Sequence, residues 1–182
     1  MVYRPTVISK RESDADFIYD AFTSLPKGYQ KMCQEYLVYV AITYTQQETD
    51  QQIKVALAHT VHTDELKEMA HEIGHLGVNK YAGLCISTKP FDIFNYIVIS
   101  IHSIRKAVEL ELTPNFTNFE DEVRFVFYHE VRHIGHHYAV LRPSEPTLSS
   151  REPRMEYEAD MFAFAIIRSR LAAERIYLWG TG

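Results

Sequence analysis

The spacing of apolar and polar residues predicts helices for most of the first half of the chain. Apolar positions recur every three or four residues, as they do along one face of a helix, in several stretches before residue 80. These stretches are 13–25, 29–45, 51–58 and 64–76. Residues 36–44 are also rich in β-branched and aromatic types, which leaves a strand as the alternative there. We therefore predict an N-terminal helical lobe over residues 1–80.

The second half of the chain has a mixed pattern. Residues 84–87 and 96–101 are short β-rich runs on either side of a turn that contains Pro90, which predicts a small sheet, in the form of a hairpin. Helical periodicity returns over 119–141 and again over about 154–175. The predicted fold is α+β and mostly helical, and residues 81–182 form a domain in which the sheet packs on the helix at 119–141.

Composition and charge narrow the function classes. The chain has 182 residues, of which 46% are hydrophobic and 13% aromatic, enough for a substantial core. A formal net charge of -5 argues against nucleic acid as a direct partner. The first residues lack the apolar segment of a secretory signal, and the longest apolar runs are too short for a membrane span. The two cysteines, Cys33 and Cys85, are expected to be reduced core residues, which suits a cytoplasmic protein.

The sequence HEVRH at positions 129–133 is the first candidate for chemistry. His129 and His133 lie one helical turn apart, so both imidazoles can reach one tetrahedral zinc ion, and Glu130 lies beside them to activate a water. On a helical projection Glu130 falls within the apolar face of this helix, with His133 next to it. A carboxylate that points into a core is costly unless it is paired or part of a site, so this position favours a functional role.

A second copy of the same motif occurs at positions 71–75, as HEIGH. His71 and His75 fall opposite the apolar stripe of their helix, among charged residues, which predicts an exposed face that lacks the dry surroundings of a catalytic metal. The alternative is that this copy is the true site, with Glu109 or Glu111 as the nearest acidic partner. Metal binding by single-site variants separates the two copies.

The last predicted helix offers the third protein ligand that a catalytic zinc ion usually has. Glu156 and Asp160 share a face with the small residues Ala159 and Ala163, which allow close approach to the preceding helix. We predict Glu156 as the ligand and Asp160 as the group that fixes the tautomer of a ligand histidine. Glu158 points the other way on the projection and is expected to be a solvated residue.

These two motifs resemble those of the gluzincin metallopeptidases, in which HExxH is followed by ExxAD or ExxAN on a second helix. The string EYEADMFA, at positions 156–163, and the short strands before HEVRH look most like the ImmA/IrrE family, and HtpX-type peptidases share EYEAD. The resemblance covers about residues 84–167. Arg132 stands where many relatives have a small residue; by helical phase it is expected to face outward, away from the metal.

The resemblance implies a soluble, zinc-dependent peptidase that cleaves a protein or peptide substrate. In this class Glu130 would take a proton from the attacking water and pass it to the leaving amine. ImmA/IrrE relatives typically cleave a transcriptional repressor, so regulatory proteolysis is the implied role. His137 and Tyr138 extend from the same helix and are candidates for substrate or oxyanion contacts, although His137 is equally suited to a structural role. A zinc-stabilised binding module without activity is the competing interpretation.

Overall fold

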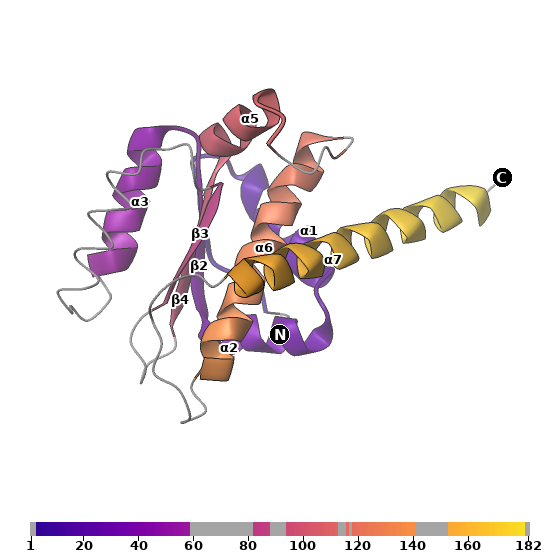
Figure 1. The fold of residues 1–182 in the computed structure, drawn as a ribbon, viewed down its shortest axis with the longest axis horizontal. Coiled ribbons are helices and arrows are strands. Elements are labelled where there is room, and N and C mark those ends of the chain that lie inside the picture. Colours follow the sequence, from indigo (N-terminus) through magenta and orange to yellow (C-terminus); the bar gives the residue numbers. More distant parts are fainter. Residues whose placement is uncertain are drawn as a thin grey trace.

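A four-stranded sheet forms the centre of the protein (Figure 1). The computed structural model describes residues 3–58, 82–87, 94–112, 116, 118–140 and 153–180. The strand order is β1-β2-β4-β3, with β1 at Val7–Ile8, β2 at Leu37–Thr43, β4 at Asn95–Ser100 and β3 at Gly83–Ser87. The first three in this order run parallel, and β3 is antiparallel to β4. The predicted mixed α+β class is confirmed.

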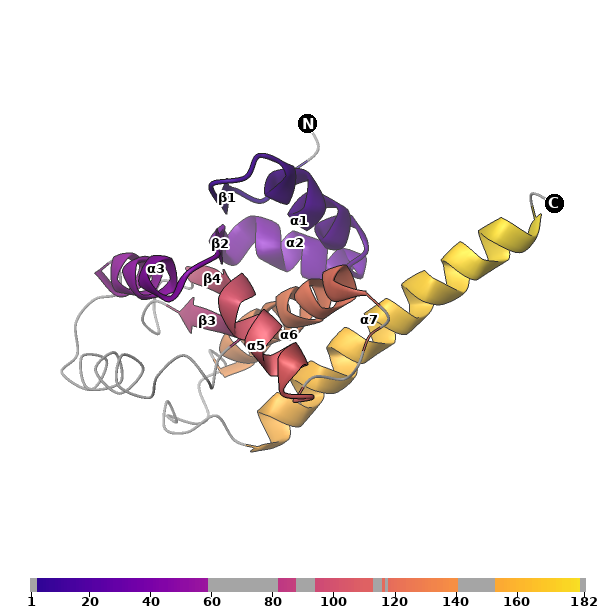
Figure 2. The same cartoon turned by 90° about the horizontal axis from the view of Figure 1, so that it is seen from above.

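Helices cover both faces of this sheet. In the described residues they are α1 at Ser13–Thr23, α2 at Lys27–Tyr36, α3 at Gln46–Ala58, α5 at Ile101–Glu109, α6 at Phe119–Val140 and α7 at Pro153–Gly180. Helix α3 lies on one face, and α1, α2 and α6 lie on the other (Figures 1 and 2). Helix α7 packs across α6 and then projects beyond the rest of the fold (Figure 2). Within the described residues, no helix is long and apolar enough to cross a membrane.

Strand β4 shows how the two faces are filled. Ile97 and Ile99 belong to the large core under α1, α2, α6 and α7, whereas Tyr96 and Val98 belong to a smaller core under α3. Successive side chains of a strand point to opposite faces, so an interior strand covered on both sides has to be apolar almost throughout. This requirement accounts for the unbroken apolar run in that segment.

Two predicted elements differ from the structure, and one observed helix has no predicted counterpart. The helix predicted over 29–45 is wrong in its second half, because α2 ends at Tyr36 and β2 follows directly. Strand β2 is an interior strand between β1 and β4, and the burial of its β-branched residues outweighs their helical spacing. The sheet therefore contains strands from both sides of residue 80. Helix α5 was not predicted: the strand predicted to end at residue 101 ends at Ser100, whose side chain accepts a hydrogen bond from the Ser103 amide and caps α5.

The predicted hairpin strands, by contrast, form the antiparallel β3–β4 pair. The cysteine prediction also holds, since Cys33 and Cys85 are free thiols buried in the large core. The predicted helix at 64–76, with the second HExxH motif, lies outside the described residues.

Candidate metal centre

Helix α6 carries the HEVRH motif and is held on the sheet by its apolar residues. The Asn118 side chain accepts a hydrogen bond from the Asp121 amide at 2.7 Å, which caps the start of the helix. Farther along, Phe127, Val131 and Ile134 are fully buried against the sheet and the neighbouring helices. The motif lies between these anchors, so its side chains have little freedom to turn toward solvent.

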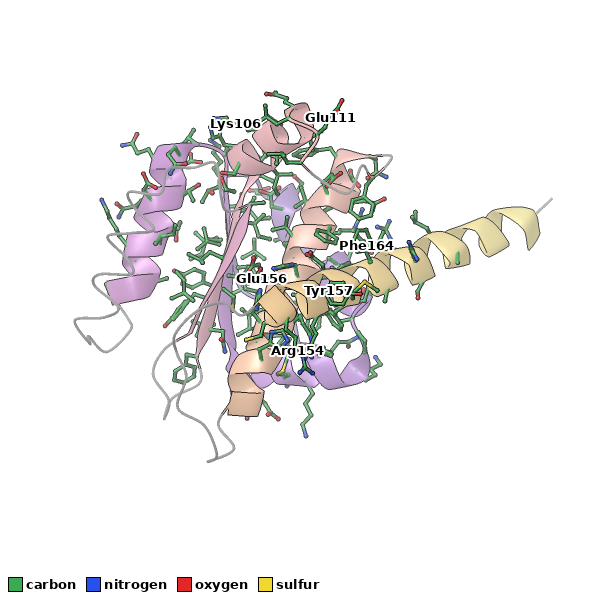
Figure 3. All side chains as sticks on the ribbon, viewed as in Figure 1. Lys106, Glu111, Arg154, Glu156, Tyr157 and Phe164 are labelled. Atoms are coloured by element: carbon green, nitrogen blue, oxygen red, sulfur yellow. The ribbon has the colours of Figure 1, made fainter. Side chains whose placement is uncertain are left out.

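The two histidines of this motif meet a carboxylate from α7. His129 Nε2 lies 3.0 Å from His133 Nε2 and 3.2 Å from Glu156 Oε2, and His133 Nε2 lies 3.5 Å from Glu156 Oε1. A tetrahedral zinc ion with bonds of 2.0–2.1 Å has ligand atoms about 3.3–3.4 Å apart. The three atoms therefore already have almost the spacing that one zinc ion requires. In Figure 3, Glu156 lies where the first turns of α7 pass α6.

His129 is oriented by Asp160, one turn after Glu156 on α7. Its Nδ1 lies 2.8 Å from Asp160 Oδ1, so Nδ1–H donates to the carboxylate and Nε2 is the nitrogen that faces the site. Burial is the largest influence on the pKa of His129 and lowers it. Hydrogen bonds to Asp160 and Glu156, with the charges of Glu130 and Glu156, outweigh burial and raise that pKa to about 10. The surroundings therefore favour positive charge at this ring.

His133 has a different second partner. Its Nδ1 lies 3.3 Å from Nδ1 of His136, and Nε2 of His136 lies 3.3 Å from Glu158 Oε2. Burial, and then the charge of Arg132, lower the pKa of His136, which favours the neutral ring. The side chain of His133 is only 5% exposed, against 32% for Glu156, so solvent reaches the centre from the α7 side.

Glu130 is buried beside the three ligand atoms and against the sheet. It is 2% exposed, and its charge is one of the influences that raise the pKa of His129. A β-carbon added to Gly83 of β3 would lie 2.8 Å from Glu130 Oε1 and 2.5 Å from Val126 Cγ1. Only a residue without a side chain fits here, and the strand backbone therefore approaches this carboxylate closely.

The donor set fits a divalent cation such as zinc. Asp160 and Glu158 act as acceptors at the outer ends of the two imidazole systems, so the Nε2 atoms of His129 and His133, 3.0 Å apart, both face the centre. A carboxylate oxygen lies beside them. Atoms of this kind at this spacing need a proton or a metal ion between them, and two nitrogens with one carboxylate are a common set for catalytic zinc. Among the described residues, His129, His133 and Glu156 form the one group of three suited to a metal ion.

A second polar cluster lies nearer the start of α6. Arg124 Nη1 is 3.1 Å from Asp121 Oδ1, and Arg124 Nη2 is 3.3 Å from Asp20 Oδ2 of α1. Arg170 of α7 also reaches Asp121, at 3.2 Å. The side chain of Asp121 is only 2% exposed, so these pairs form a buried junction of α1, α6 and α7.

The structure places most of the predicted site residues as the sequence implied. It brings together His129, His133, Glu156 and Asp160, with Glu130 adjacent. The side chains of His137 and Tyr138, and the whole of the other motif with His71, Glu72 and His75, lie outside the described residues. The acidic residues proposed for the alternative site, Glu109 and Glu111, lie at the exposed end of α5 and just after it.

Two expectations about neighbouring residues are wrong. Arg132 does not point away into solvent: its Nη1 donates to the Tyr29 hydroxyl at 2.8 Å and its Nη2 to Glu158 at 3.2 Å. Glu158 is not simply solvated, because its carboxylate accepts hydrogen bonds from His136, Arg132 and Arg154. The i,i+4 pair of Arg154 and Glu158 is visible in the sequence, but nothing in the sequence indicates the contact with Tyr29.

No protein-family model, curated protein or solved structure matches this chain. The membership of a gluzincin family therefore rests on the two motifs and on the geometry described above, and it remains a prediction.

Proposed function

We propose that this protein is a zinc-dependent metallopeptidase of the gluzincin type. The observation that carries the proposal is the convergence of His129, His133 and Glu156, whose ligand atoms lie within 4.8 Å of one another. Glu156 comes from a different helix and lies more than twenty positions after His133, so its meeting with the two histidines is not a by-product of local sequence. The proposed cofactor is Zn²⁺.

The chain's own residues support each part of peptide hydrolysis. Bound zinc would polarise a peptide carbonyl and lower the pKa of a water molecule toward neutrality. Glu130, which is buried and whose charge acts on His129, would accept a proton from that water and return it to the leaving nitrogen. Asp160 fixes His129 with its Nε2 lone pair directed at the site.

The proposed substrate is a protein or peptide. Glu156 and Asp160 are 32% and 48% exposed, so in this proposal the substrate would approach the centre from the side of α7. The motif resemblance suggests selective, regulatory proteolysis, for example of a repressor. The buried free thiols Cys33 and Cys85 agree with a reducing, cytoplasmic location, which we include in the proposal.

A zinc assay combined with Glu130→Gln tests this function. The wild-type protein is expected to bind one zinc ion per chain, measured by elemental analysis, and to cleave an unstructured protein such as casein or a mixed peptide library. Glu130→Gln is expected to keep the zinc and to reduce cleavage by about 10²–10⁴-fold, the usual contribution of a general base. Cleavage that survives this substitution would contradict the mechanism.

Glu120→Gln is the matched control, since Glu120 lies on the same helix and its side chain is 69% exposed. It is expected to leave both zinc content and cleavage unchanged. Stoichiometric zinc without any cleavage by the wild-type protein would instead favour a zinc-binding interaction module. Loss of the metal in His71→Ala but not in His129→Ala would move the site to the other motif.

A further inference from the structure

We infer that His136 and Glu158 are positioning residues that hold His133 in the form that binds metal. This inference rests on the proposed zinc site and assigns a role to residues outside the two motifs' ligand sets. The contacts run in one line, from His133 Nδ1 to His136 Nδ1 at 3.3 Å and from His136 Nε2 to Glu158 Oε2 at 3.3 Å.

Glu158 sets the direction of this line. Because a carboxylate only accepts hydrogen bonds, Nε2 of His136 has to donate to it, and the Nδ1 of a neutral His136 is then an acceptor. His133 must donate through Nδ1–H, which leaves its Nε2 with a lone pair 3.0 Å from His129 Nε2. The opposite direction would turn a lone pair of His136 toward Glu158 and would block His133 with a proton on Nε2. The observed contacts therefore select the tautomer that a metal requires.

Two arginines and a tyrosine keep Glu158 in place. Arg132 Nη2 donates to its Oε2 at 3.2 Å, and Arg154 Nε donates to its Oε1 at 3.0 Å. Arg132 also reaches the Tyr29 hydroxyl on α2, so the acceptor is tied to α2, α6 and α7. Gly135 leaves room for this arrangement, because a β-carbon there would lie 3.1 Å from Arg132 Nη1.

The two ligand histidines thus obtain the same orientation by different means. His129 donates directly to Asp160, whereas His133 donates to a carboxylate through a second imidazole. Outer partners of metal ligands typically contribute 10–100-fold in metal affinity. A contribution of this size is expected from the line through His136, separate from that of Asp160.

Four variants test the inference by zinc affinity, measured by competition with a chromophoric chelator. His136→Phe keeps a ring but removes the acceptor, and its zinc dissociation constant is expected to rise about 10–100-fold. Glu158→Leu is expected to weaken zinc binding in the same range, and Glu158→Gln, which retains an accepting oxygen, to stay within about threefold of wild type. The double variant His136→Phe/Glu158→Leu is expected to be no weaker than His136→Phe alone, because both changes break one line of contacts.

Arg168→Ala is the control, since Arg168 is an exposed arginine of the same helix that lies well beyond Glu158; a change within about twofold is expected. Circular dichroism of the metal-free variants checks folding, and if His136→Phe does not fold, the Glu158 pair decides. Long-range ¹H–¹⁵N spectra of the wild-type holoprotein are expected to give His136 as the Nε2–H tautomer and His133 as the Nδ1–H tautomer.

Unchanged zinc affinity in His136→Phe or Glu158→Leu overturns the inference, as do losses that multiply in the double variant or the reverse tautomers. In each of these cases the wild-type protein still binds zinc and the proposed function stands. A wild-type protein that does not bind zinc overturns both proposals together.

Discussion

The two polar clusters on α6 differ in how their charges are balanced. Near the start of the helix, Arg124 and Arg170 meet Asp121, and Arg124 also meets Asp20, so each buried charge has an opposite charge from the protein itself. Around the HEVRH motif, the inner atoms of His129, His133 and Glu156 are all electron-rich and point to one place. The first cluster is complete as a structural junction. The second holds a proton on His129 in the metal-free protein and, in the proposed function, a zinc ion in its place.

This difference is a useful criterion for recognising a site. Burial and a high density of charged residues are common to both clusters, so neither property alone distinguishes a functional site from a structural ion-pair cluster. The outer hydrogen bonds do separate them, because Asp160 and Glu158 take the outer nitrogens of His129 and His136 and leave Nε2 of both ligand histidines facing the centre.

Asp121→Ala breaks the buried junction near the start of α6 and is expected to be the most destabilising change. It leaves Arg124, whose side chain is 7% exposed, without its closest acidic partner, and the loss of unfolding free energy should be about 3–5 kcal/mol. Urea denaturation of the metal-free protein measures this quantity. Glu120→Ala, which removes an exposed partner of the same arginine, should change stability by less than about 1 kcal/mol. Equal effects of the two substitutions would show that burial does not distinguish these pairs.

Glu156→Gln changes the cluster around the HEVRH motif and should reduce the stability that the protein gains from zinc. Wild-type protein with free zinc at about 1,000 times the dissociation constant should gain about 4 kcal/mol of stability over the metal-free form. In the variant at the same zinc concentration, this gain should fall below about 1 kcal/mol, because one ligand is lost. Thermal unfolding with and without zinc gives the difference. Glu109→Gln, an exposed change on α5, should keep the full gain; its loss there would support the alternative site.

Gly83→Ala tests the close approach of strand β3 to Glu130. The new β-carbon would collide with Val126 and Glu130, so stability is expected to fall by about 1–3 kcal/mol and cleavage to fall further than stability, because Glu130 is displaced. Gly28→Ala is the matched control, since no atom lies within 4 Å of its added β-carbon and alanine favours the helix. Chemical denaturation and a cleavage assay on the same samples compare the two. Full activity in Gly83→Ala would refute the close contact with Glu130.

The smallest expected effect concerns the reactivity of Cys33, a thiol whose pKa is shifted by burial. Burial raises the pKa of its thiol to about 12, so the native protein at pH 8 should react with a thiol reagent only as fast as it unfolds. The folded pKa lies above the unfolded value of about 8.5, so the contribution of the neutral thiol to stability is complete below pH 8.5 and declines as pH rises toward 12. Absorbance of the released reagent, with and without urea, measures the reaction. Rapid labelling of both cysteines in the native state would contradict their burial.

Local periodicity explains what the sequence could predict. The faces of α6 and α7 follow from a rotation of about 100° per residue. The sequence alone therefore predicts that His129 and His133 face Glu156 and Asp160. Strand β2 was not predicted in this way, because its apolar run satisfies both periods and its pairing with β4 joins segments more than fifty residues apart. Tyr29, which belongs to α2, approaches Arg132 through this long-range packing and leaves no trace in the local pattern.

The ion pair between Arg170 and Asp121 also fixes the direction of α7 at a point far from Glu156. Glu156 lies about 21 Å up the helix axis from that anchor, at 1.5 Å per residue, so a tilt of only about 3° at the anchor would shift the ligand by about 1 Å. A change far from the centre can thus loosen the grip on an ion while leaving every coordinating group intact. In the proposed function, the fit of the zinc ligands therefore depends also on an ion pair that does not touch them.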